Sequence, residues 1–209
     1  SPDIIRAFRQ AKKTSKTLAV ANVSDSTIAK ESENFIQTLA GPEIGIGATK
    51  TYIAQLTVIY MIAGILSQNN DFLNELYNIP EYIGEVLEKS DEIEELAEKY
   101  AFEDNALVMG SGFAYPIALE GSLKLMEIAG MYAIACAGGE LKQGKLTLVN
   151  DKIPVIAVVV PGKDYQKTMD DLEQVKMFKG TILSVGPKDD EELNNISDSV
   201  IEINPKVRD

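Results

Sequence analysis

Residues 105–137 read NALVMGSGFAYPIALEGSLKLMEIAGMYAIACA, and this stretch decides the fold class. It opens with an apolar run, 105–110, and a glycine-rich turn follows. The pattern after the turn predicts a helix over 116–129, and the apolar run 132–137 predicts a second strand. Continuous apolar strands are typical of parallel sheets that are buried on both faces. The stretch therefore predicts a strand–helix–strand unit of an α/β fold.

The alternation continues on both sides of this unit. After it, we expect a short helix near 138–143, a helix over 164–178 and strands at 153–160, 181–186 and 199–203. Before it, we expect a capped helix that starts at Ser1, strands at 17–23 and 35–40, and a long apolar helix over 49–67. Strands that alternate with helices predict a parallel, doubly wound sheet.

Charge and composition exclude several classes of function. The chain has 209 residues, with 20 Lys and Arg against 32 Asp and Glu, and a formal net charge of −12. A surface this acidic repels phosphate backbones and anionic membranes, so we expect no nucleic-acid and no membrane partner. The absence of histidine excludes His-based triads and HExxH zinc sites, and we assign no metal and no cofactor.

The single cysteine and the start of the chain indicate the setting. Cys136 lies in an apolar run, which predicts that its thiol is buried and inert. A single cysteine cannot form an internal disulfide, which fits a reducing cytoplasm. No uninterrupted apolar run reaches about 18 residues, and the first residues do not resemble a signal peptide. The first residue is Ser rather than Met, and we expect the chain to begin partway through a longer protein.

An internal duplication predicts two domains. Residues 9–16 and the strand after them align without gaps on residues 173–180 and the strand at 181–186. Each copy contains a segment that the other lacks, so we expect both domains to be incomplete. We predict a first domain at 1–78, an amphipathic helical connector at 79–100 and a second domain at 101–209 that lacks its last helix.

Two helix-based features could carry chemistry. The helix over 116–129 places Glu120, Lys124 and Glu127 on one face, where a carboxylate beside a cation could act as a base. A solvated salt-bridge face is the commoner outcome of such a pattern. Ser1 heads the first helix and could bind an anion, although a plain N-cap is favoured on this feature alone.

Two glycine-rich loops are the remaining candidates. Residues 109–122 place Gly-Ser-Gly between a strand and a helix, where open α/β sheets bind ligands, but a tight turn also explains these glycines. Residues 138–145, GGELKQGK, carry Glu140, Lys142 and Gln143 between glycines. This segment could close over a ligand or form a simple surface turn.

Three stretches together resemble one family. They are GPEIGIGATKTYIAQL (41–56), YPIALEGSLKLMEIAG (115–130) and GGELKQGKLTLVND (138–151). Their order and spacing resemble the sugar isomerase (SIS) domain family, as found in the isomerase half of glucosamine-6-phosphate synthase. The resemblance implies a three-layer αβα sandwich in each of two tandem SIS domains, a homodimer and a cytoplasmic enzyme of sugar phosphate metabolism.

The resemblance also implies roles for particular residues in binding a phosphosugar. Ser1 corresponds to the last hydroxyl residue of a phosphate-binding loop. Ile46 and Gly47, followed by Ala48 and Thr49, correspond to the segment that contacts the sugar. Glu127 corresponds to the base that moves a proton between C1 and C2, and Lys124 corresponds to a lysine near the sugar.

Two departures from the family pattern keep three hypotheses open. Gln143 stands where the family has a histidine that assists ring opening, and Met126 stands where the synthase usually has a lysine. The first hypothesis is an isomerase or deaminase of a hexose or amino-sugar 6-phosphate, with Glu127 as base. The second is a deglycase of a phosphorylated ketosamine. The third is a non-catalytic phosphosugar sensor. The sequence does not specify the sugar, nor whether a glutaminase domain precedes Ser1.

Overall fold

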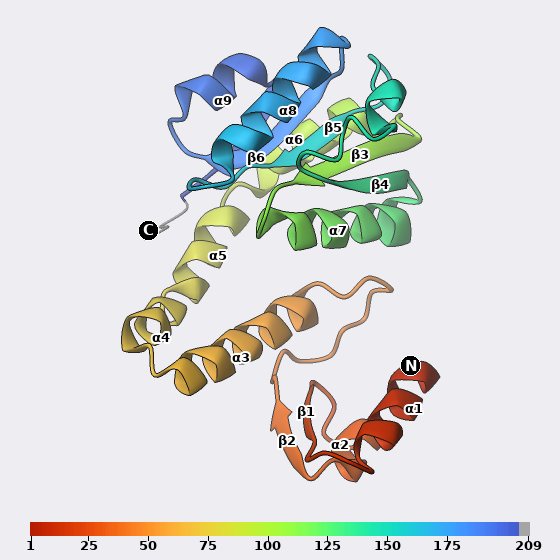
Figure 1. Cartoon of the computed structure of the whole chain (residues 1–209), viewed down its shortest axis with the longest axis vertical. Coiled ribbons are helices and arrows are strands. Elements are labelled where there is room, and N and C mark those ends of the chain that lie inside the picture. Colours follow the sequence, from red (N-terminus) through yellow and green to blue (C-terminus); the bar gives the residue numbers. More distant parts are fainter. Residues whose placement is uncertain (205–209) are drawn as a thin grey trace. The chain divides into compact units, whose positions relative to one another are not determined.

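The computed structural model describes residues 1–204 (Figure 1). It divides into two compact units, Ser1–Pro80 and Glu81–Asp209, which are described separately below. The expected connector, 79–100, forms two helices, and its residues from Glu81 onward group with the second unit. The last five residues of the predicted second domain lie outside the described residues.

The first unit has a small parallel sheet and four helices. Its elements are α1 (Pro2–Ala11), β1 (Leu18–Ala21), α2 (Thr27–Glu31), β2 (Asn34–Gln37), α3 (Lys50–Ser67) and α4 (Asn70–Leu76). Strands β1 and β2 pair in parallel, from Leu18 opposite Asn34 to Ala21 opposite Gln37. Helix α4 is absent from the prediction; its N-cap is Asn69, whose side chain accepts a hydrogen bond from the Phe72 N–H at 3.0 Å.

Both strands of the first unit are shorter than predicted. After β2, hydrogen bonds to one side chain take the place of the backbone hydrogen bonds between the two strands. The Asn22 Oδ1 accepts hydrogen bonds from the Ala40 N–H at 2.9 Å and from the Thr38 hydroxyl at 3.1 Å. Its amide group donates to the Gly41 carbonyl at 2.6 Å. The residues after β2 are therefore held by one asparagine and leave the sheet early.

Helix α3 is the longest apolar helix among the described residues. By length and composition alone it could span a membrane. The core helix of a soluble protein passes the same test, so one such helix is weak evidence for a membrane span. It ends at Gln68, in the left-handed conformation, and the chain turns directly into α4. At Gly64 a Cβ atom would lie 2.6 Å from the Leu73 side chain, so this glycine permits the close approach of the two helices.

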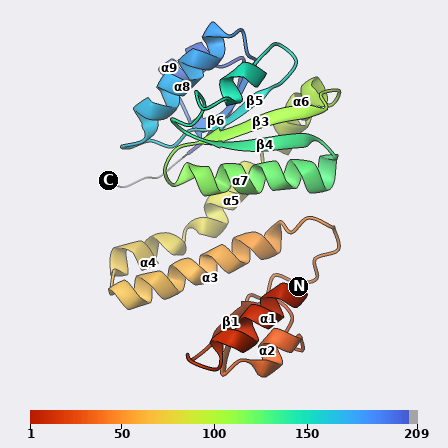
Figure 2. The same cartoon turned by 45° about the vertical axis from the view of Figure 1, so that its right-hand side comes forward.

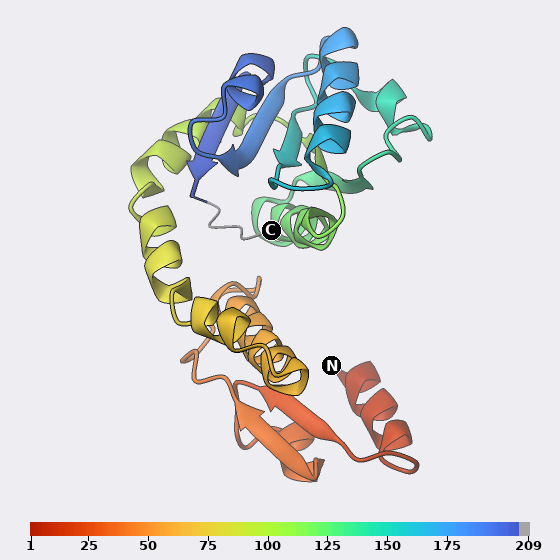
Figure 3. The ribbon, with the colours of Figure 1, turned by 60° about the vertical axis from the view of Figure 1, so that its left-hand side comes forward.

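The second unit is a five-stranded parallel sheet with helices around it. Its elements are α5 (Ile79–Leu87), which begins at the boundary, α6 (Ser90–Tyr100), β3 (Asn105–Gly110), α7 (Ala114–Lys124), the π-turn η1 (Leu125–Ala129), β4 (Tyr132–Ala137), the 3₁₀ turn η2 (Lys145–Leu148), β5 (Val155–Val158), α8 (Tyr165–Met177), β6 (Ile182–Pro187), α9 (Glu191–Ile196) and β7 (Ser199–Ile203). The strand order is β4-β3-β5-β6-β7, and every pairing is parallel. Figure 3 shows the edge strand β7 in blue.

Helices cover both faces of this sheet, which confirms the predicted doubly wound α/β fold. Helix α7 lies on one face, and α8 and α9 lie on the other (Figure 2). Successive residues of β3 alternate between two cores. Leu107 and Met109 belong to the larger core with α8, whereas Ala106 and Val108 belong to the smaller core with α7. Cys136 is fully buried in the larger core, and burial raises the pKa of its thiol.

Two helix predictions need correction. The short helix expected near 138–143 does not form: the segment is a series of turns, and a 3₁₀ turn follows over Lys145–Leu148. The reason is that Gly139 and Gly144 take positive φ angles of 82° and 96°, which a right-handed helix excludes. The helix expected over 116–129 begins earlier, at Ala114, and its last five residues form a π-turn.

Candidate functional site

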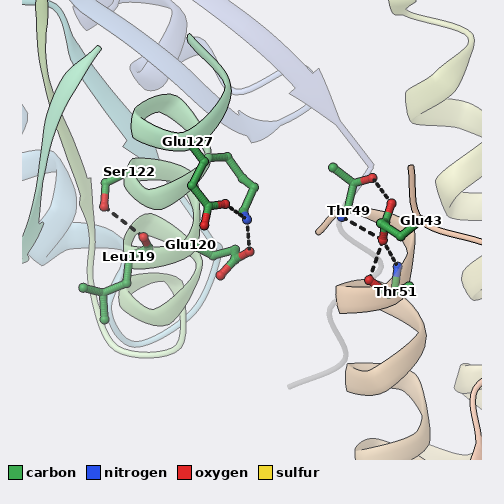
Figure 4. A network of polar contacts seen from close by, with 8 residues as sticks. Glu43, Thr49, Thr51, Leu119, Glu120, Ser122 and Glu127 are labelled. Carbon is green, nitrogen blue, oxygen red and sulfur yellow. Dashed lines mark hydrogen bonds and ion pairs between the residues drawn. The ribbon is translucent and has the colours of Figure 1, made fainter. Parts of the chain in front are cut away.

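The predicted cluster of Glu120, Lys124 and Glu127 forms at the end of α7 and on the π-turn that follows it. The Lys124 Nζ donates a hydrogen bond to Glu127 Oε2 at 2.5 Å and lies 3.4 Å from Glu120 Oε1 (Figure 4). Glu120 and Lys124 are one helical turn apart, so the helix places both on the same face. The hydrogen bond to Glu127 raises the pKa of Lys124, burial opposes the increase, and Glu120 adds to it. Glu120 and Lys124 are half-buried, whereas Glu127 is exposed.

Glu127 lies on a widened turn. The Gly130 N–H bonds to the Leu125 carbonyl, five residues earlier, which is the spacing of a π-helix. Gly130 then ends the helix in the left-handed conformation, with φ of 68°. Such turns are rare inside α-helices and frequently occur at functional sites. The local pattern predicts the end at Gly130 but not the extra residue in the turn.

A carboxylate organises the predicted sugar-binding segment, 46–49, in the first unit. Glu43 accepts hydrogen bonds from the Thr51 N–H at 3.0 Å, from the Thr49 N–H and hydroxyl at 3.3 Å each, and from the Thr51 hydroxyl (Figure 4). The hydrogen bond from the Thr51 hydroxyl is the main reason that the pKa of Glu43 is lowered. Glu43 therefore caps α3, which begins at Lys50. Sequence reasoning missed it because the cap acts from six residues before Thr49.

The segment that Glu43 closes is open to solvent except at one residue. Gly47 is buried, whereas Ala48 and Thr49 are exposed. Ile46 is 91% exposed, which is unusual for a large apolar side chain. The other predicted binding residue of this unit, Ser1, is exposed at the start of α1, and its side chain makes no cap hydrogen bond. Both predicted binding elements thus lie at helix N-termini, where N–H groups favour anionic and polar ligands, although Glu43 already accepts the Thr49 and Thr51 N–H groups at α3.

The structure does not bring Gln143 to Glu127 within one chain. Gln143 is exposed in the segment that follows the carboxyl end of β4, whereas Glu127 precedes the amino end of that strand. A strand of six residues spans about 20 Å. Gln143 and Glu127 therefore belong to opposite ends of the sheet of the second unit.

The glycine-rich turn after β3 is filled by the chain itself. The order of the sheet reverses direction between β3 and β5, where doubly wound folds usually bind ligands. At Gly112 a Cβ atom would lie 2.0 Å from the Asp164 Oδ2, so the carboxylate of the β5–α8 connection occupies this position. Close packing explains these glycines. Among residues 1–204 no group of three or more His, Cys, Asp or Glu side chains could hold a metal ion.

Known proteins similar to this chain share its pattern over almost its whole length. The SIS domain family model matches residues 1–64 and 99–208. The chain is 40% identical over 207 residues to the glutamine–fructose-6-phosphate aminotransferase (isomerizing) of Methanothermobacter thermautotrophicus, covering 99% of this chain and 35% of the relative. It is also 40% identical over 205 residues to the enzyme of that name from Aquifex aeolicus, covering 97% of this chain and 34% of the relative. The chain thus spans about a third of the length of these relatives.

Solved structures of similar proteins match the same part of the chain. The C-terminal domain of glucosamine-fructose-6-phosphate aminotransferase from Francisella tularensis matches with a TM-score of 0.89 and 29% identity, over 98% of this chain and 60% of that one. A glucosamine-6-phosphate deaminase from Thermotoga maritima shares the fold, with a TM-score of 0.70 and 23% identity over 88% of this chain and 56% of that one. The family match covers both units and the sequence identity is substantial, and we conclude that this chain belongs to the SIS domain family.

Proposed function

We propose that this chain is the phosphosugar-binding part of an isomerase-type enzyme in which Glu127 moves a proton between C1 and C2 of a hexose or amino-sugar 6-phosphate. The contact between Lys124 and Glu127 carries this proposal, because it places a carboxylate and an ammonium group 2.5 Å apart on a π-turn. Aldose–ketose conversion needs a base above C1–C2 and a donor for the oxygen that becomes negative. Glu127 has the chemistry of the base, and Lys124 has the chemistry of the donor.

Binding of the phosphate is assigned to Ser1 and the start of α1. The alternative is the start of α3, but Glu43 already supplies a carboxylate to the first N–H groups there. A second anion at α3 would be repelled by that carboxylate. We therefore assign the phosphate to α1 and the uncharged sugar hydroxyls to Ile46, Gly47, Ala48 and Thr49. Holding the phosphate away from the reacting carbons would keep the substrate in place during proton transfer.

Gln143 is assigned to the site of a second copy of this chain. Because Gln143 and Glu127 lie at opposite ends of β4, one chain does not supply both to one substrate. A homodimer in which each copy lends its Gln143 segment to the other would combine them. Gln143 can donate and accept hydrogen bonds at the sugar ring but cannot take a proton. A cytoplasmic location follows from the same proposal, since sugar phosphates are intracellular metabolites.

The relatives named above are aminotransferases, and this chain matches only a third of their length. Amino transfer from glutamine is therefore outside our assignment, which concerns the isomerising step. A deglycase would use the same proton transfers on a phosphorylated ketosamine. A non-catalytic sensor is favoured by one observation, the replacement of an ionisable residue by Gln143.

Deuterium exchange tests the proposal directly. The complete natural protein is incubated with fructose 6-phosphate or glucosamine 6-phosphate in D₂O, and deuterium at C1 and C2 is followed by NMR. We expect exchange that disappears in Glu127→Gln and persists in the control Glu173→Gln, which changes an exposed residue of α8. Exchange that persists in Glu127→Gln would show that another group is the base. Saturable binding without exchange would identify a sensor or a different substrate.

A further inference from the structure

A buried carboxylate of α8 holds the segment that carries Gln143. Asp171 is only 5% exposed, and its Oδ2 accepts a hydrogen bond from the Gly139 N–H at 2.6 Å. Gly139 has a positive φ of 82°, and a Cβ atom there would lie 2.7 Å from the Lys167 Cε. The segment therefore passes close over α8, and the positive φ of Gly139 favours glycine at the point of contact.

A second contact lies one helical turn away on the same helix. The Thr168 hydroxyl donates to the Ser111 Oγ at 2.8 Å, and both residues are buried. A Cβ atom at Gly138 would lie 1.8 Å from that Ser111 Oγ. Helix α8 thus joins the turn after β3 to the segment after β4 through Thr168 and Asp171. Of these two contacts, the Asp171 bond is the one that reaches the segment itself.

Backbone hydrogen bonds within local turns connect Gly139 to Gln143. The Glu140 N–H bonds to the Ala137 carbonyl at 2.9 Å, and the Gln143 N–H bonds to the Glu140 carbonyl at 3.1 Å. Leu141, between them, is fully buried in the core that α8 covers. The position of Gln143 therefore depends on where Gly139 and Leu141 are held.

The buried position of Asp171 needs an explanation for its polar side chain. Burial raises the pKa of Asp171, which shows that the site disfavours the carboxylate, while the Gly139 N–H and the nearby Lys167 and Lys142 favour it. An apolar side chain would fill the same space without this cost. A carboxylate at this place is explained by what it does for the Gly139 N–H.

We propose that Asp171 is a positioning residue that fixes the Gly138–Lys145 segment and so places Gln143 for its role at the sugar. The effect on the reaction rests on the proposed function; the effect on the segment does not. Asp171→Leu removes the acceptor at similar volume, and Asp171→Asn keeps an acceptor oxygen but removes the charge. Asp170→Leu changes the exposed neighbour on the same helix and is the matched control.

Hydrogen exchange of the complete natural protein tests the effect on the segment. We expect Asp171→Leu to speed amide exchange over 138–145 about tenfold or more, with exchange over α7 unchanged. Asp171→Asn and Asp170→Leu should leave the segment protected. If Asp171→Leu does not fold, Asp171→Glu provides the second variant, because it moves the acceptor by one methylene and should weaken protection in the same place. Unchanged protection in a folded Asp171→Leu or Asp171→Glu protein would overturn the proposal.

A double-mutant cycle with Gln143→Ala tests the effect on the reaction. We expect Asp171→Leu and Gln143→Ala to lower kcat on ring-closed substrate to a similar extent, with little change in KM and a smaller loss on an open-chain analogue. The double variant should be no worse than either single variant. Additive losses would show that Asp171 does not act through Gln143 and would overturn the proposal. A wild-type protein without any exchange at C1 or C2 would instead contradict the proposed function, and hydrogen exchange alone would then decide whether Asp171 holds the segment.

Discussion

The Glu43 carboxylate accepts the Thr51 N–H at 3.0 Å, so an acidic side chain lies at the beginning of α3, directly after the segment proposed to bind the sugar. This arrangement joins two functions in one residue. Glu43 caps the helix, and it closes the chain between itself and Thr49 into a defined loop. The loop is thereby preorganised, which lowers the entropy cost of binding a ligand.

Removal of this cap is expected to weaken substrate binding. Glu43→Ala should raise the KM for the sugar phosphate several-fold and change kcat little. Without the cap, the loop is no longer preorganised and must be ordered each time the substrate binds. Steady-state kinetics measure this, and Glu33→Ala, an exposed residue of the same unit, is the control. An unchanged KM in Glu43→Ala would show that the loop does not contact substrate.

Loss of the ammonium partner is expected to reduce catalysis. Lys124→Gln removes the group that both carboxylates contact, and we expect kcat to fall about 100-fold, the lower range for a general acid–base contribution. Lys152→Gln, at an exposed position of the same unit, should behave as the wild type. If only KM changes in Lys124→Gln, the lysine binds substrate without assisting proton transfer.

The missing histidine gives a gain-of-function test. Gln143→His restores a group that can transfer protons near neutral pH, so turnover of a ring-closed substrate should increase more than turnover of an open-chain analogue. Parallel assays on the two substrates measure the difference. Equal effects on both would exclude ring opening as the explanation.

The fold of the second unit has an acid-sensitive contact at Asp198. Burial opposes its ionisation, but hydrogen bonds from Lys176 and the Ile182 N–H, each at 2.8 Å, lower its pKa overall. Because the pKa is lower in the folded state than the unfolded value near 3.9, this contact stabilises the fold above about pH 4 and loses its effect as the pH falls through the folded value. Asp198→Asn should therefore lower the Tm at pH 7 and lower it less at pH 3. A Tm difference that is the same at both pH values would contradict this linkage.

Two glycines of the second unit predict opposite effects of alanine. At Gly110 a Cβ atom would lie 2.5 Å from the Ala114 carbonyl oxygen, which is backbone and cannot move aside, so Gly110→Ala should cost about 1–3 kcal/mol. Gly84 lies inside α5 with no atom within 4 Å of a Cβ position, so Gly84→Ala should add about 0.5–1 kcal/mol. Chemical denaturation of both variants measures the free energy of unfolding, and equal signs would show that local space does not decide the outcome.

The sequence pattern predicted the interior strand β3 at 105–110 well, because burial of five of its six residues leaves a continuous apolar run. Residues 132–137 and 199–203 form strands with the predicted bounds, and the α/β class follows from these runs. The pairing of Lys124 with Glu127 was also predictable, because helical spacing places them together. The family resemblance supplied the remaining site residues, whose roles stay predictions.

Contacts that depend on distant residues could not be predicted. The bond between Gly139 and Asp171 joins residues 32 apart, and no local pattern indicates such a partner. The turns over 138–144 were also missed: a helix was expected there, but glycines with positive φ form turns instead. The π-turn depends on one extra residue, which leaves no sign in a pattern of apolar positions.

The π-turn has a consequence for how such proteins can diverge. One residue rotates everything after it on a helix by about 100°. Loss of the codon for Leu125 or Met126, within the π-turn, would leave Glu127 two residues after Lys124 instead of three, a spacing at which helical side chains do not face each other. A proton-transfer enzyme and a silent sugar receptor could therefore be separated by one small deletion, without any substitution at the base.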